Sequence, residues 1–114
     1  MQLANRFEVP VPVDQAWEVL LDVPRVARCL PGATLDERDG DTYHGQVKLK
    51  IGSITASYRG QATVSAADPS QRTALVTASG REQRGGGRAS AEVRVRLFPD
   101  GERTRVEVVT ELSI

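Results

Sequence analysis

The feature that most constrains the fold is an alternation of apolar and polar residues that begins after Ala33 and continues to the end of the 114-residue chain. Successive side chains of a strand point to opposite faces of a sheet, so a period of two is typical of strands with one buried face. Here it repeats over about six strands, which predicts an antiparallel sheet packed on one side. The predicted apolar face carries Tyr43, Val47, Leu49, Ile51, Ala56, Tyr58, Ala62, Val64, Ala74, Val76, Ala78, Val93, Val95, Leu97, Val106, Val108 and Leu112.

One strand and two short helices are predicted before this run. The apolar residues of the strand are Leu3, Phe7 and Val9, which alternate with polar residues. Pro10 and Pro12 end the strand. The first helix has an acidic residue, Asp14, in its first turn, where a negative charge suits the helix dipole. Its apolar stripe is Val13, Ala16, Trp17, Leu20 and Leu21. Asp22 is the expected N-cap of the second helix, which Pro31 and Gly32 end. The apolar residues of this second helix are Val23, Val26, Ala27 and Leu30.

Two turns predict strand register. A two-residue loop at Asp100 and Gly101 keeps apolar partners on one face, and its pairs are Leu97 with Thr104, Val95 with Val106, and Val93 with Val108. A two-residue loop at Asp39 and Gly40 would instead pair Leu35 with His44, which places an apolar and a polar residue on the same face of the sheet. We therefore expect a three-residue loop, Arg38 to Gly40, which pairs Leu35 with Tyr43 and places Gly40 in the left-handed conformation.

Composition excludes several classes of function. Acidic and basic residues balance at fifteen each, so neither nucleic acid nor an anionic membrane is expected as the main partner. Cys29 is the only cysteine, which excludes an internal disulfide and favours a reducing compartment. The sequence has neither a signal-peptide pattern nor a membrane-spanning stretch, so we expect a cytoplasmic protein.

Two segments resemble the G-subunit family of carbon monoxide dehydrogenase. They are "PVPVDQAWEVLLDVPRVARCLPGA" and "GQVKLKIGSITASYRGQATV", and the similarity extends over nearly the whole chain. This family belongs to the START-like (SRPBCC) superfamily. The resemblance implies an α+β helix-grip fold, in which a curved antiparallel sheet wraps around a long C-terminal helix and the two short helices wall one end of a cavity.

The resemblance also implies a function. START-like cavities hold apolar molecules, so the expected role is non-enzymatic binding of a lipid or quinone. The family role is to assist maturation or membrane attachment of a molybdenum-containing dehydrogenase, which implies such an enzyme as partner and contact with a membrane surface. No cofactor is expected. The inner-face residues expected to bind the ligand are Tyr43, Val47, Leu49, Tyr58, Val76 and Val95.

Two other functions remain open. A small START-like enzyme such as a polyketide cyclase needs polar groups in the cavity for acid–base chemistry, and the predicted inner face offers only Tyr43 and Tyr58. Both tyrosines equally fit plain core packing. The third possibility is an interaction module that pairs its open sheet face with another protein.

The chain ends at Ile114, inside the last predicted strand, and the long C-terminal helix of the family has no residues here. We therefore expect one START-like domain over residues 1–114, truncated at its C-terminal end. A bare apolar sheet face is larger than a monomer usually exposes. A second copy is the simplest cover, so the expectation is a homodimer.

The remaining candidate sites have simple structural explanations. His44 is the only histidine and is predicted on the outer face, so neither a metal site nor a catalytic triad is expected. Cys29 is expected to be a buried small residue, and Trp17 an anchor of the first helix. The glycines at 85–87 lack the context of a phosphate-binding loop and predict a hairpin tip. The tip is flanked by Arg81, Arg84 and Arg88, which form the one locally basic part of the sequence. This part is either a solvated loop or a contact with a partner protein or with lipid headgroups.

Overall fold

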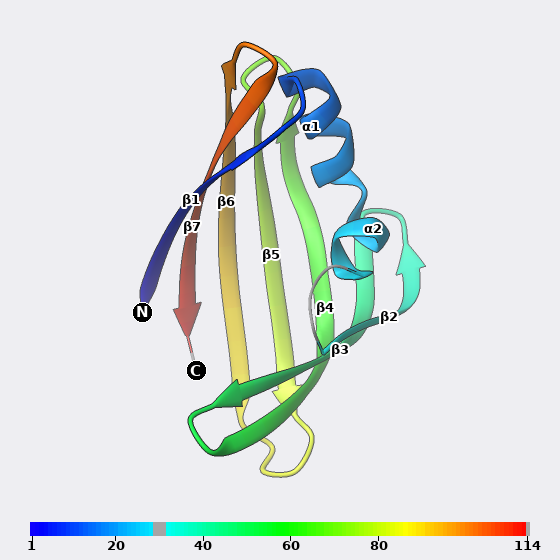
Figure 1. Ribbon diagram of the computed structural model, residues 1–114. Coiled ribbons are helices and arrows are strands. Elements are labelled where there is room, and N and C mark those ends of the chain that lie inside the picture. Colours follow the sequence, from blue (N-terminus) through cyan, green and yellow to red (C-terminus); the bar gives the residue numbers. More distant parts are fainter. Residues whose placement is uncertain (29–31, 114) are drawn as a thin grey trace.

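The computed structural model describes residues 1–28 and 32–113, except for the side chains of Leu49 and Ile51. The elements along the chain are β1 (Gln2–Val9), α1 (Val13–Leu21), α2 (Val23–Arg28), β2 (Ala33–Asp39), β3 (Thr42–Ile51), β4 (Ile54–Asp68), β5 (Thr73–Glu82), β6 (Arg88–Asp100) and β7 (Arg103–Ser113). The predicted order of one strand, two helices and six strands is confirmed (Figure 1).

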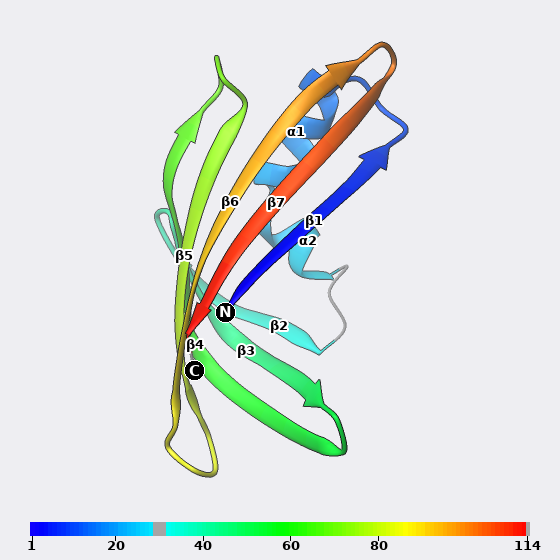
Figure 2. The ribbon, with the colours of Figure 1, turned by 90° about the vertical axis from the view of Figure 1, so that its left-hand side faces the viewer.

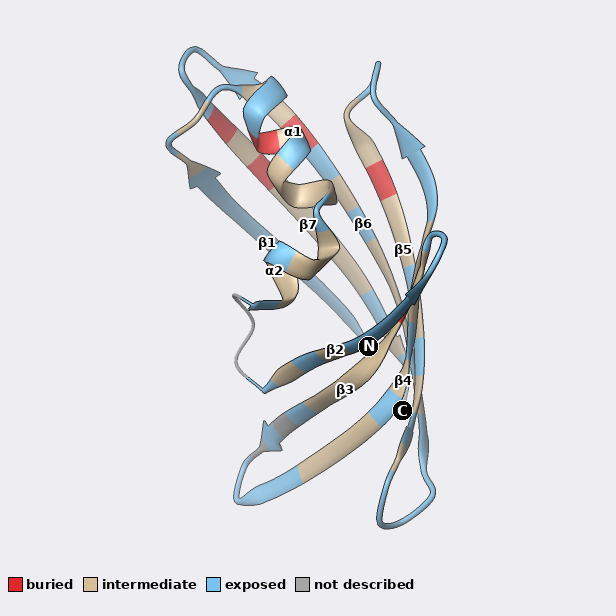
Figure 3. Cartoon of the chain, turned by 90° about the vertical axis from the view of Figure 1, so that its right-hand side faces the viewer, coloured by how far each residue is buried: buried red, intermediate tan, exposed pale blue. Residues whose placement is uncertain are grey.

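All seven strands form one antiparallel sheet in the order β1-β7-β6-β5-β4-β3-β2. Both helices lie on one side of this sheet, which curves and twists around them (Figures 2 and 3). We call this side the concave face and the opposite side the outer face. Within the described residues no long helix covers the concave face, and no helix is long and apolar enough to cross a membrane.

The core lies under α1. Ala16 of α1 packs against Leu97 of β6 and Val106 of β7, and these three residues are at most 3% exposed. Trp17 is half-buried against the same cluster. Most of the buried residues gather at this end of the sheet (Figure 3). The apolar stripe predicted for α1 therefore does face the sheet.

Two polar contacts fix the chain around α1. Thr104 of β7 is fully buried, and its hydroxyl donates a hydrogen bond to the Val11 carbonyl oxygen at 2.9 Å, which ties the β1–α1 link to the sheet. At the start of α2, the Arg25 N–H donates to the Asp22 carboxylate at 3.4 Å. The N-cap role predicted for Asp22 is thereby confirmed. Cys29, Leu30 and Pro31, which were predicted to complete and end α2, lie outside the described residues.

The predicted register of the last hairpin is wrong by two residues. Asp100 pairs with Arg103, so the loop consists of Gly101 and Glu102, and Gly101 takes a positive φ of 62°. Leu97 consequently lies opposite Val106 instead of Thr104, and Val95 lies opposite Val108 instead of Val106, while Val93 faces Thr110. A shift of two residues preserves the faces, and it brings two buried aliphatic residues together under α1.

The predicted three-residue loop between β2 and β3 is also wrong. Asp39 pairs with Thr42 across a two-residue loop, and Leu35 lies opposite Gly45 rather than Tyr43. A register shift between Leu35 and Glu37 accommodates one extra residue and returns Leu35 to the concave face. The positive φ predicted for Gly40 is confirmed at 61°.

Candidate ligand-binding groove

An apolar groove of about 310 Å³ lies on the concave face, beyond the end covered by α1. One wall comes from α2, through Val23 and Ala27. The opposite wall comes from β3 and β4, and Leu112 of β7 closes the far side. None of the described residues that line the groove carries a charged side chain. The groove is therefore suited to an apolar ligand or to the apolar part of a larger one.

Small residues form the floor of the groove. Ala62, Ala78 and Ala91 lie directly opposite one another on β4, β5 and β6. The next row toward the β5–β6 hairpin has hardly any side chains at all, because it consists of Gly45, Gly60, Gly80 and Ala89. Directly opposite residues share a face of the sheet. Because both of these adjacent rows consist of small residues, they leave open space above the backbone on the concave face.

Two glycines of this row also allow the neighbouring strand to approach closely. A Cβ atom added to Gly60 would overlap the Ser79 carbonyl oxygen and lie 2.6 Å from the Gly80 Cα. A Cβ atom added to Gly45 would overlap the Thr34 carbonyl oxygen. Neither glycine has a positive φ, so close approach of the neighbouring strand, not an unusual backbone conformation, requires them.

The two tyrosines provide polar groups at the groove wall. Tyr43 is 6% exposed, and the Arg38 guanidinium lies 5.1 Å from the centre of its ring. Tyr58 is half-buried on the neighbouring strand, opposite Val47. Each phenol can donate or accept one hydrogen bond, which suits orientation of a mostly apolar ligand.

The structure brings together part of the predicted ligand site. Tyr43, Val47 and Tyr58 line the groove. Val76 and Val95 lie on the same face nearer to α1, and Val95 packs against the buried cluster. The Leu49 side chain lies outside the described part of the structure, although its backbone pairs with Ala56. Ligand binding by these residues stays a prediction.

Sequence reasoning missed the residues that make room for the groove. The available signal was a glycine at an inward position of three consecutive strands, at Gly45, Gly60 and Gly80. Glycine in a strand interior marks a bend or a close backbone approach. The alignment of the alanine row with the glycine row could be recognised only once the strand register was known.

The groove has no catalytic cluster among the described residues. His44 lies on the outer face, as predicted, and no group of three or more metal-binding side chains occurs in the described chain. Asp68 has a lowered pKa because the Ser70 hydroxyl and the Gln71 and Ser70 N–H groups donate to its carboxylate. Asp68 is the last residue of β4, and this hydrogen bonding shapes the turn that leads to β5.

The sequence matches a family model that describes the G subunit of carbon monoxide dehydrogenase (CoxG), over residues 6–113. No protein of curated function matches it. Solved structures similar to the fold include a conserved protein from Geobacillus kaustophilus, with a TM-score of 0.84 and 20% identity over 99% of this chain and 74% of that one.

Two further similar structures are enzymes. The ZhuI aromatase/cyclase from Streptomyces sp. R1128 has a TM-score of 0.64 and 20% identity, over 99% of this chain and 67% of that one. Norcoclaurine synthase from Thalictrum flavum has a TM-score of 0.66 and 17% identity, over 98% of this chain and 68% of that one. At these identities the likeness establishes the START-like helix-grip fold and no activity.

Proposed function

Because the chain belongs to the CoxG family of carbon monoxide dehydrogenase, we propose that it binds a lipid or quinone in the concave groove without catalysing a reaction on it. Through this ligand it would assist the maturation or membrane attachment of a molybdenum-containing dehydrogenase. The observation that carries the proposal is the uncharged lining of the groove, because each Å² of apolar ligand surface removed from water contributes about 25 cal/mol.

The size of the groove supports a partly enclosed ligand. Its volume of about 310 Å³ is near the lower end of the range for small-molecule sites. That volume suits a ring system or a segment of an acyl chain, so the remainder of a long lipid would extend from the open side. Tyr43 or Tyr58 would hydrogen-bond a carbonyl or hydroxyl oxygen of the enclosed part.

A START-like enzyme is the second candidate, and the aromatase/cyclase and the synthase among the similar structures favour it. General acid–base catalysis needs a titratable group within hydrogen-bond reach of the reacting atom. Within the described lining, the two tyrosine hydroxyls are the only titratable groups. We therefore rank binding above catalysis.

Filling the groove should abolish ligand binding. We expect Ala78→Phe to weaken binding of ubiquinone-1 at least tenfold in calorimetric titration, because the new ring would occupy the floor between Ala62 and Ala91. Thr77→Phe is the matched control, since Thr77 is the exposed neighbour on the outer face of the same strand. Equal affinity of both variants would place the quinone outside the groove. Conversion of the bound quinone by the wild-type chain would instead favour the enzyme.

We further propose that a second copy covers the concave face. A folded monomer of 12.4 kDa is expected to expose about 6,100 Å². This chain exposes 7778 Å², an excess of roughly 1,600 Å² over that expectation. A standard protein interface hides about 800 Å² on each partner, so the excess is large enough for a stable dimer. Leu3 and Phe7, which are 46% and 44% exposed on the concave side of β1, would contribute to the contact.

Sedimentation equilibrium tests the dimer directly. We expect the 114-residue chain to have twice the monomer mass at micromolar concentration, and Phe7→Glu to shift it toward monomer because a charge would be buried in the contact. Arg6→Glu changes a neighbouring outer-face residue of β1 and should leave the mass unchanged. A wild-type chain that sediments as a monomer and unfolds cooperatively would contradict the proposal.

A further inference from the structure

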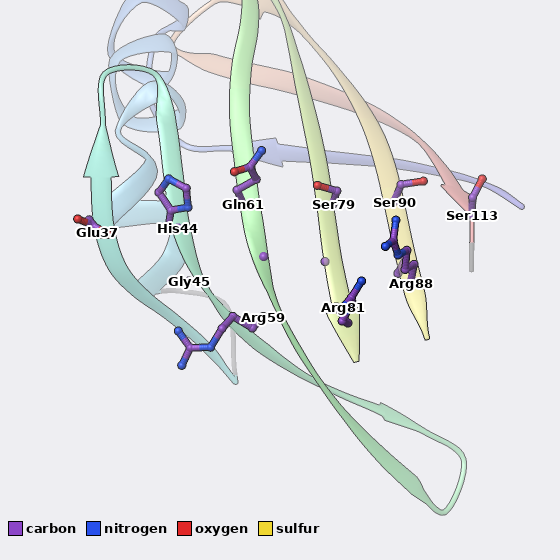
Figure 4. A pocket seen from close by; sticks show the side chains of 13 residues that line it. Glu37, His44, Gly45, Arg59, Gln61, Ser79, Arg81, Arg88, Ser90 and Ser113 are labelled. Atoms are coloured by element: carbon purple, nitrogen blue, oxygen red, sulfur yellow. The ribbon is translucent and has the colours of Figure 1, made fainter. Parts of the chain in front are cut away.

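A second hollow, of about 720 Å³, lies on the outer face of the sheet (Figure 4). It lies behind the row of Gly45, Gly60 and Gly80, whose backbone also lines the concave groove. The two cavities are thus on opposite faces of the same part of the sheet. Unlike the groove, this second cavity is lined mainly by polar and basic side chains from β3 to β7. We call it the outer hollow.

Three arginines occupy one row of strand positions across the outer hollow, with the side chains of Arg81 and Arg88 near each other and that of Arg59 extending away from them (Figure 4). Arg59 of β4 is directly opposite Arg81 of β5, which is directly opposite Arg88 of β6. Neighbouring strands are about 4.8 Å apart, so the row extends over about 10 Å. Like charges placed directly opposite each other destabilise a sheet. An anion bound between Arg81 and Arg88 would relieve the repulsion between them.

Carboxylates of the chain leave most of this positive charge available. Asp36 pairs with Arg59 at 3.5 Å. Within the described residues, neither Arg81 nor Arg88 has a carboxylate oxygen within 4.0 Å. Glu37 also lines the outer hollow, but it is on β2, three strands and about 14 Å from Arg81.

A row of neutral hydrogen-bonding groups accompanies the arginines. Ser79, Ser90 and Ser113 lie directly opposite one another on β5, β6 and β7, and Gln61 of β4 continues the row. Figure 4 shows Ser79 and Ser90 beside Arg81 and Arg88 on the same strands, with Gln61 and Ser113 on the strands to either side. All four residues of the row are exposed, so their polar groups are accessible to a ligand.

We propose that the outer hollow binds a phosphate-bearing ligand with at least two negative charges. Arginine matches phosphate oxygens through paired N–H donors, and serine hydroxyls and the glutamine amide supply further donors to the same anion. A phosphate group has more acceptor oxygens than a carboxylate, so it satisfies a larger share of this donor set. The proposal is independent of the ligand in the concave groove, because the two cavities use opposite faces.

The test uses the full chain at low ionic strength, with inorganic pyrophosphate as the soluble probe and citrate as a carboxylate of similar charge. Calorimetric titration should give at least tenfold tighter binding of pyrophosphate than of citrate. Arg81→Gln combined with Arg88→Gln should weaken pyrophosphate binding at least tenfold. The control combines Arg94→Gln with Arg96→Gln, which removes the same charge from the outer face of β6 outside the hollow. It should change the affinity less than twofold.

Vesicles distinguish the source of the phosphate. Co-sedimentation compares phosphatidylcholine vesicles with vesicles that also contain phosphatidylglycerol. Binding to the anionic vesicles that needs Arg81 and Arg88, without binding of pyrophosphate, would support the site and assign it to a lipid headgroup. Binding of pyrophosphate would support a soluble phosphate ligand. Absence of both interactions, equal losses in the two double variants, or equal affinity for citrate would overturn the proposal.

Discussion

Gly60→Ala is expected to destabilise the fold by about 3 kcal/mol, at the upper end of the cost of overpacking. The added methyl group would overlap the Ser79 carbonyl oxygen and lie 2.6 Å from the Gly80 Cα, and both atoms belong to the backbone of β5. A side chain could rotate away, but a strand that pairs on both edges cannot move without losing ladder hydrogen bonds. The free energy of unfolding, measured with denaturant, gives the cost directly.

Two other glycines provide matched controls for this prediction. A Cβ atom on Gly80, in the same row, would be 3.4 Å from the nearest atom, which is ordinary contact. A Cβ atom on Gly87 would have nothing within 4 Å. Alanine at either position also restricts the unfolded chain, so each variant should be within about 1 kcal/mol of the wild type. Equal stability of all three variants would show that the β5 backbone does not approach Gly60 this closely.

The sequence was sufficient to predict the architecture, because every strand after residue 33 has one apolar and one polar face. The helices were predictable for a similar reason, since Ala16 and Trp17 share a stripe that needs a sheet to cover it. The family resemblance then identified the helix-grip fold among the possible antiparallel sheets. The family match over residues 6–113 confirmed the resemblance, and the similar solved structures confirmed the fold.

Strand register was less predictable from local turn chemistry. At the last hairpin, both candidate loops contain Gly101 and both keep the same faces, so alternation cannot distinguish a shift of two residues. Burial of Leu97 against Val106 beneath α1 decides between them, and this is a tertiary contact. At the first hairpin, the irregularity near Asp36 compensates for a loop that alone would have exchanged the faces.

The candidate sites were predictable only in part. Tyr43, Val47 and Tyr58 were placed correctly on the concave face by alternation. The floor of the groove was not, because alanines and glycines give a weak apolar signal and only register aligns them. The same holds for the arginine row, since Arg59 is far in sequence from the hairpin that carries Arg81 and Arg88.

Trp17→Ala is expected to cost about 3 kcal/mol, near the lower end for removal of a large core side chain. Trp17 packs against the cluster of Ala16, Leu97 and Val106, which contains three of the five buried hydrophobic residues among the described positions. Few residues in this chain are fully buried, so one aromatic side chain contributes a large share of the contact between α1 and the sheet. Its half-buried state keeps the expected cost below that of a fully enclosed tryptophan.

Glu18→Ala is the matched control, because Glu18 is on the same helix outside the buried cluster and its replacement should change the free energy of unfolding by less than about 0.5 kcal/mol. Denaturant unfolding of both variants separates loss of packing from a change in helix propensity. Among the described elements, α1 makes its main contacts with β6, β7 and α2, so a weakened contact should release the helix and leave the sheet's ladder in place. A loss below about 1 kcal/mol for Trp17→Ala would mean that Ala16 and the aliphatic residues alone hold α1 on the sheet.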